Sequence, residues 1–257
     1  DLRGVAAALV LMVSTLLLAR IALSHARMAR IAAAAAPASA TWRAMTDDVR
    51  LAMRIPHDVP VRVTAAIGVP AVVGLARPVL LLPSEADEWD ADTRRAVVLH
   101  ELAHVARRDA LSQLVSQVAC AIYWCLPLVW HAARRAAALR ERASDDHVLR
   151  AGIRASAYAE SLIVLARLAR GGDMHAAALS MARPSRMRER VVAILDPGVR
   201  REAPARATIG LTVATSICAV ALLAAIQPAA AAAVAPALDR ITTTPGPSEP
   251  GVTVAMN

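Results

Sequence analysis

Apolar residues form three runs along the chain that are long enough to cross a lipid bilayer as helices. Residues 5–23 carry a single charge, Arg20, and residues 111–130 and 207–226 carry none. At a rise of 1.5 Å per residue, each run would extend through about 30 Å of hydrocarbon as a helix. The pattern therefore predicts a mainly α-helical membrane protein, with spanning helices at residues 1–23 and 207–227. A signal peptide is the alternative for the first run, but neither a charged n-region nor a clean small-residue cleavage site frames it.

Between the first and the last run, the pattern changes to short strands and shorter helices. Val61 and Val63 alternate with polar positions, and residues 71–75 and 79–82 flank a turn, which predicts a small β-strand pair. Its edge could pair with an extended peptide, or the strands could only cover the next helix. We expect linking or interfacial helices at residues 24–60, one domain at residues 61–206 and a flexible tail at residues 228–257, which are rich in Ala and Pro.

The charges orient the chain in the membrane. All 29 basic residues are Arg, and 26 of them lie between Arg27 and Arg206. Because positive residues remain on the cytoplasmic side, this middle part is predicted to be cytoplasmic. Nucleic-acid binding is the alternative for a net charge of +8, but the Arg residues are dispersed and only 2% of residues are aromatic. We expect a protein partner and the lipid bilayer, and no direct contact with nucleic acid.

Residues 100–104 read HELAH, a pattern typical of zinc hydrolases. His100 and His104 lie one helical turn apart on the same face, so both imidazoles can bind one Zn²⁺ ion. Glu101 is adjacent and can accept a proton from a water molecule that the ion activates. The alternative is a solvated pair of His residues on an amphipathic helix. The apolar neighbours argue against it, because a buried Glu beside a buried His needs a partner. Asp90 or Asp92 can cap this helix.

A third metal ligand is expected from residues 139–150. Glu141 and Asp145 are also four residues apart, so they share one face of a second helix. We predict Glu141 as a ligand and Asp145 as the acceptor that orients a ligating His. His147 is the competing third ligand. On its own this segment would be interpreted as a charged surface helix.

A ligand at Glu141 is incompatible with a full membrane crossing by residues 111–131, because it would place the carboxylate roughly 30 Å from the two imidazoles. We therefore expect an apolar helical hairpin that turns near residues 125–127. Its outward arm from His104 is nine residues longer than its return arm to Glu141, 23 against 14. A bend must absorb this difference, and the pattern does not locate it.

Three stretches together resemble the BlaR/MecR-type membrane zinc metallopeptidases, an antirepressor family. Residues 70–83 resemble the strand pair of that family, and residues 94–111 its HExxH helix with the trailing Arg-x-Asp. Residues 123–152 resemble its apolar turn and E-x-x-x-D helix. The resemblance implies integral membrane helices that flank a cytoplasmic gluzincin-like zinc peptidase domain.

The resemblance also implies roles for individual residues. It implies that His100, His104 and Glu141 bind Zn²⁺, that Glu101 is the general base and that Asp145 supports a ligand. By the scheme of that family, the substrate would be a cytoplasmic DNA-binding repressor. Ser144 stands where the family usually has Cys, and no penicillin-binding sensor domain follows Ile226, so β-lactam sensing is not implied.

The sequence leaves two questions open. The oxyanion formed during peptide cleavage needs a hydrogen-bond donor, for which Tyr158, His147 and Arg190 are weak candidates. Tyr158 could equally be a helix core residue. The leading function is regulated cleavage of a cytoplasmic protein by a membrane metalloprotease. The alternatives are a housekeeping membrane protease of the HtpX or CAAX-processing type and a non-catalytic signalling protein stabilised by zinc.

Overall fold

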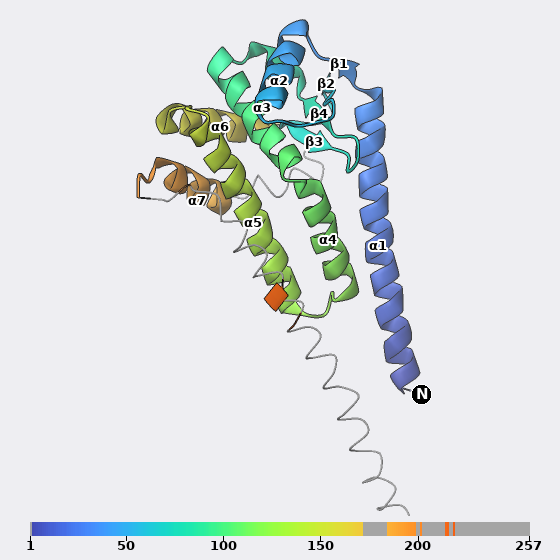
Figure 1. Ribbon diagram of the computed structural model, residues 1–257. Coiled ribbons are helices and arrows are strands. Elements are labelled where there is room, and N and C mark those ends of the chain that lie inside the picture. Colours follow the sequence, from blue (N-terminus) through green and yellow to red (C-terminus); the bar gives the residue numbers. More distant parts are fainter. Residues whose placement is uncertain (1, 172–183, 199–200, 202–213, 216–217, 219–257) are drawn as a thin grey trace, which may run out of the picture. The chain divides into compact units, whose positions relative to one another are not determined.

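The computed structural model describes residues 2–171, 184–198, 201, 214–215 and 218. The chain divides into two units, Asp1–Arg201 and Glu202–Asn257. The helices of the first unit are α1 (Leu2–Ala34), α2 (Ala40–Ala52), α3 (Ala91–Ala106), α4 (Asp109–Ile122), α5 (Pro127–Arg150), α6 (Ala155–Gly171) and α7 (Pro184–Leu195), with a short 3-10 helix at Ser84–Glu88 (Figure 1). Its strands are β1 (Ala36–Pro37), β2 (Val61–Val63), β3 (Ala71–Val73) and β4 (Val79–Leu82).

The expectation of a mainly helical chain with a small sheet is confirmed. Apart from residues 214–215 and 218, the expected second span and tail lie outside the described residues.

The sheet has four strands in the order β1-β2-β4-β3, which corrects the expected strand pair. Strands β3 and β4 form the expected antiparallel hairpin, and β2 adds to β4 in parallel. Strand β1 is only two residues long, and the Arg62 guanidinium holds the chain next to it by donating to the carbonyl oxygens of Ala33 and Ala35 at 3.1 Å. A strand of this length has no periodic pattern, so the sequence did not reveal it. Gly74 has a φ of +105°, and a Cβ there would clash with the Arg77 carbonyl oxygen, so the hairpin turn requires glycine.

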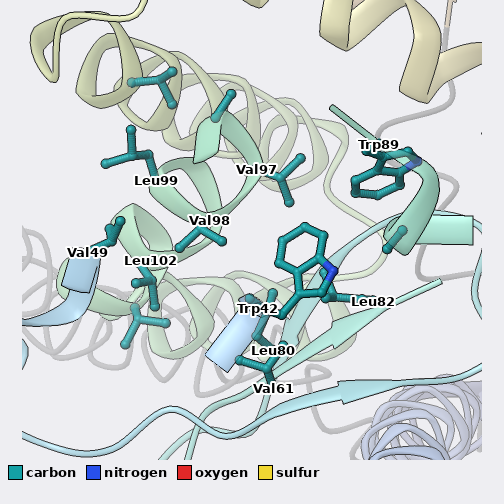
Figure 2. Close-up of a cluster of buried hydrophobic side chains, with 14 of the residues drawn as sticks. Trp42, Val49, Val61, Leu80, Leu82, Trp89, Val97, Val98, Leu99 and Leu102 are labelled. Atoms are coloured by element: carbon teal, nitrogen blue, oxygen red, sulfur yellow. The ribbon is translucent and has the colours of Figure 1, made fainter. Parts of the chain in front are cut away.

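Helix α3 lies at the centre of the hydrophobic core. It contacts α2, β3, α4, α5 and α6, and most of its side chains are buried. Figure 2 shows Val97, Val98 and Leu102 of this helix beside Trp42 of α2 and Leu80 of β4. A helix that is apolar on nearly all sides has to be enclosed by other elements. This enclosure fixes the position of the residues that α3 carries.

Strand β4 is covered on both faces, which is why its sequence is a continuous apolar run. Leu80 and Leu82 pack into the main core, whereas Leu81 packs against Ala32 and Ala35 at the end of α1. Helix α1 therefore continues past the expected boundary at Leu23 and ends against the sheet. Within the described residues it is the one helix, Gly4–Ala34, that is long and apolar enough to cross a membrane.

Helices α3 and α4 are separated by a break at Arg107–Arg108, where the expected bend lies. Arg108 has φ 55° and ψ 41°, the left-handed conformation, and α4 begins at the next residue. The chain reverses between α4 and α5 at residues 123–126, and the two helices pack together. The break and the turn take up part of the outward arm, so its helical part is α4, with 14 residues. The mismatch in length with the return arm therefore disappears.

The core predicts a large effect for substitution of Trp42. Its side chain is fully buried and packs edge-to-face on Trp89 at 6.1 Å between ring centroids. We expect Trp42→Ala to lower the free energy of unfolding by about 3–5 kcal/mol, because it leaves a cavity. Leu51→Ala, on the same helix but 64% exposed, should change it by about 0.5 kcal/mol or less. Chemical denaturation in detergent measures both, and equal effects would contradict this description of the core.

Candidate metal centre

Helix α3 carries two imidazoles that face each other. The helix is capped by Asp90, whose carboxylate accepts hydrogen bonds from the Thr93 backbone N–H at 2.9 Å and from the Thr93 hydroxyl at 2.7 Å. Of the two expected caps, Asp90 is thus the one that is used. One helical turn separates His100 from His104, and their Nε2 atoms lie 3.3 Å apart. His100 is buried, whereas the His104 side chain retains 19% of its exposure.

Helix α5 brings the carboxylate of Glu141 to these imidazoles. Glu141 Oε2 lies 3.6 Å from His100 Nε2, and Oε1 lies 3.8 Å from His104 Nε2. One ligand atom from each of the three residues lies within 4.8 Å of the others. His147, the competing third ligand, is not part of this group in the described chain. Its Nδ1 instead lies 3.4 Å from the Arg150 guanidinium.

The three residues fit a tetrahedral metal ion. Zinc binds imidazole nitrogen and carboxylate oxygen at about 2.0–2.2 Å, so ligand atoms around it are roughly 3.3–3.6 Å apart. The observed separations of 3.3, 3.6 and 3.8 Å are close to this range. Glu141 Oε2 is buried and has no hydrogen-bond partner in the described chain, although Arg190 Nη1 lies 3.1 Å away as an ion pair. A buried carboxylate oxygen of this kind is satisfied when it coordinates a cation.

Asp145 occupies the opposite side of the His100 ring. Its Oδ1 lies 3.2 Å from His100 Nδ1, while Glu141 faces Nε2. Asp145 also accepts hydrogen bonds from the Tyr158 hydroxyl at 2.7 Å and from Arg190 Nε and Nη2 at 2.9 and 2.6 Å. The carboxylate is therefore fully bonded, and it holds the ring so that Nε2 points to Glu141 and His104.

The surroundings of His100, Glu141 and Asp145 shift the pKa values of these three residues. Burial lowers the pKa of His100, but the carboxylates of Asp145 and Glu141 on either side of the ring outweigh it and raise the pKa to about 9. Burial raises the pKa of Glu141, but the nearby His100 imidazole and the charge of Arg190 outweigh it and lower the pKa to about 2. For Asp145, Arg190 and His100 likewise overcome burial and hold the pKa well below its usual range. A metal ion that binds His100 Nε2 must displace its proton.

Three residues beside His104, namely Asp109, Arg107 and Ser144, were not predicted from the sequence as parts of the site. Asp109 Oδ2 lies 2.7 Å from His104 Nδ1, and Arg107 donates to the same carboxylate. The Ser144 hydroxyl lies 3.2 Å from His104 Nε2 and accepts a hydrogen bond from Arg107 at 2.7 Å. The trailing Arg-x-Asp is visible in the sequence, but residues five positions apart do not face each other on a continuous helix.

Glu101 and Tyr158 lie close to the cluster in different settings. Glu101 is buried in α3, and its side chain makes no hydrogen bond or ion pair with the residues that the structure describes. The Tyr158 hydroxyl is 2.9 Å from His100 Nδ1 and donates to Asp145, on the side of the ring away from Nε2. Burial and the nearby Asp145 raise the pKa of this phenol, so it stays a donor.

Two comparisons with known proteins find similarity to this chain. The family described as BlaR1 peptidase M56 matches residues 3–194, which include every residue of the cluster. The regulatory protein BlaR1 of Bacillus licheniformis is 35% identical over 81 residues, which is 32% of this chain. The chain covers 14% of the length of that relative.

The cluster predicts one metal ion per chain. We expect the purified protein to contain about one equivalent of zinc, and His104→Ala or Glu141→Ala to lower it severalfold, because each removes a ligand. The matched controls are His131→Ala and Glu160→Ala, which change exposed residues of the same types. Elemental analysis of the dialysed proteins checks this. Equal zinc in all five proteins would exclude the cluster as the site.

Proposed function

The chain belongs to the BlaR1 peptidase M56 family, and we propose that it is a membrane-bound zinc endopeptidase that cleaves a cytoplasmic regulatory protein in signal transduction. The observation that carries the proposal is the convergence of His100, His104 and Glu141 from two helices, with ligand atoms within 4.8 Å of one another. Two imidazoles and one carboxylate are a ligand set of catalytic zinc, which leaves a position for water or substrate. The gluzincin-like fold expected from the sequence is part of this proposal.

The residues of the chain divide the chemistry among them. Bound zinc would supply an activated water molecule and polarise the scissile carbonyl. Glu101, adjacent to His100 and without a competing partner among the described residues, would accept a proton from the attacking water and pass it to the leaving amine. Asp145 keeps His100 in one orientation. The Tyr158 hydroxyl supports this role because it donates a hydrogen bond to Asp145. That Tyr158 donates to the oxyanion stays a prediction.

The sheet offers a binding edge for an extended peptide. In the order β1-β2-β4-β3, strand β3 is at the edge, and β3 contacts α3. An extended substrate can add to such an edge through main-chain hydrogen bonds. We propose that the protein substrate pairs with β3, and that it is a DNA-binding repressor, in keeping with the regulatory role that the name of the relative states.

We further propose that α1 crosses the membrane and that the tip of the α4–α5 hairpin enters the cytoplasmic leaflet. Helix α1 lies beside α4 (Figure 1). Between them, His25 Nε2 lies 3.2 Å from Gln117 Oε1. Helix α4 continues from there for five residues, roughly 7–8 Å, to Ile122. The exposed side chains around the turn are apolar or aromatic: Ile122, Tyr123, Leu126, Leu128 and Trp130. The second span at residues 207–227 and the cytoplasmic orientation stay part of this proposal.

Replacement of Glu101 tests catalysis separately from metal binding. We expect Glu101→Gln to retain zinc, because it changes no ligand, and to lower cleavage by about 100-fold or more, because the proton acceptor is lost. Glu160→Gln, an exposed residue of α6, serves as the control. Comparing the cellular proteins cleaved by the wild type and by Glu101→Gln identifies the substrate and measures the loss.

The outcome also distinguishes the alternatives. Cellular signalling that persists in Glu101→Gln would indicate a non-catalytic protein that uses zinc for its fold. Cleavage of many unrelated damaged or lipidated proteins would indicate a housekeeping protease. A single cleaved DNA-binding protein would support the regulatory function.

Tryptophan fluorescence tests the membrane contact of the hairpin. The four Trp residues are Trp42 and Trp89 in the core and Trp124 and Trp130 at the hairpin. In nanodiscs with brominated lipids we expect partial quenching, because bromine quenches indoles at membrane depth. The double variant Trp124→Phe/Trp130→Phe should lose that quenching. Equal fractional quenching before and after the substitutions would show that the hairpin lies outside the lipid.

A further inference from the structure

The break between α3 and α4 is maintained against local preference. Residues 91–122 contain neither Gly nor Pro, so nothing in the local sequence requires a helix to end at Ala106. Yet Arg108 adopts the left-handed conformation with φ 55°, which is unfavourable for a residue with a side chain. Contacts elsewhere must therefore stabilise the break.

The break is what allows Asp109 to reach His104. On a continuous helix, residues five positions apart point about 140° away from each other. With the break, Asp109 Oδ2 lies 2.7 Å from His104 Nδ1, and the carboxylate is largely buried, with 12% of its side chain exposed. Each imidazole of the pair thus has its own carboxylate on Nδ1: Asp145 for His100 and Asp109 for His104.

Arg107 joins this carboxylate to the helix that carries Glu141. Its guanidinium donates to Asp109, to the Ser144 hydroxyl at 2.7 Å and to the Arg140 carbonyl oxygen at 3.0 Å. Arg140 immediately precedes Glu141, and Ser144 lies one helical turn after it. The Arg107 side chain therefore holds the end of α3 against α5 through one residue before Glu141 and one residue after it.

We propose that Asp109 and Arg107 are positioning residues of the metal centre, which rests on the proposed zinc site. Asp109 accepts the proton on Nδ1 of His104, which fixes the tautomer with Nε2 free to bind the ion. Arg107 holds Asp109 in place and sets the position of α5 along α3, so that Glu141 meets the two imidazoles. The left-handed Arg108 is the conformational cost of this arrangement.

Metal affinity tests the role of Asp109. We expect Asp109→Ala to weaken zinc binding by about 10–100-fold in competition with a chromophoric chelator. Asp109→Asn should recover part of the affinity, because its amide oxygen still accepts from Nδ1. Asp48→Asn, an exposed acid on α2, is the matched control and should bind zinc as the wild type does.

The Co²⁺-loaded proteins give a readout that does not depend on activity. The visible absorption of Co²⁺ reports ligand geometry, so Asp109→Ala and Arg107→Ala should shift or broaden it, whereas Arg95→Ala, an exposed Arg of α3, should not. Circular dichroism verifies that each variant is folded. A role in stability alone would lower the melting temperature and leave both affinity and spectrum unchanged, which would overturn the proposal.

The test also separates this proposal from the proposed function. If the wild type binds zinc and Asp109→Ala binds it equally well with the same Co²⁺ spectrum, only the positioning role fails. If the wild type binds no metal, both the peptidase assignment and the positioning role fail. If affinity falls in Asp109→Ala and is partly restored in Asp109→Asn, the positioning role is supported.

Discussion

Four helices meet at the carboxylate of Asp145. It lies on α5, accepts hydrogen bonds from Tyr158 of α6 and Arg190 of α7, and faces His100 of α3. A buried charge is tolerated only when its partners are in place, and removal of one partner from a buried ion pair typically costs about 3–5 kcal/mol. The positions of α5, α6 and α7 are therefore coupled to the same contact that orients His100, so the packing of these helices and the geometry of the site depend on each other.

The need of a buried charge for partners also explains how the charged residues are arranged in the site. Asp145 and Glu141 lie on one face of α5, and two carboxylates this close together would repel each other in a buried position. Arg190 lies between them, with its nitrogens 2.6 Å from Asp145 and 3.1 Å from Glu141. The guanidinium completes the bonding of Asp145 but leaves Glu141 Oε2 without a hydrogen bond within the described chain. One carboxylate is thus fixed as an orienting group, and the other remains able to bind a cation.

The helix break and the hairpin connect the site to the apolar surface of the chain. Helix α3 is enclosed by the core, whereas α4 leaves it beside α1 and carries exposed apolar residues such as Leu111 and Val115. A continuous α3–α4 helix would carry Asp109 away from His104. By turning at Arg107–Arg108, the chain keeps a polar cluster within the core and still presents the apolar side chains of α4 at the surface. The polar cluster is enclosed in the core, whereas the apolar side chains of α4 are exposed, and the break separates the two.

The sequence by itself determined what depends on local geometry. The spacing of His100 and His104 and that of Glu141 and Asp145 place each pair on one helix face, because the α-helix repeats every 3.6 residues. The acidic cap of α3 is local in the same sense, although the choice of Asp90 over Asp92 came from the structure. Only the tertiary structure decided that Arg190, 45 residues after Asp145, completes the buried network, and that Asp109 turns back to His104. The two-residue strand β1 belongs to the same group. These contacts depend on how the elements pack, and the short-range periodicity of a sequence does not encode which distant side chains will meet.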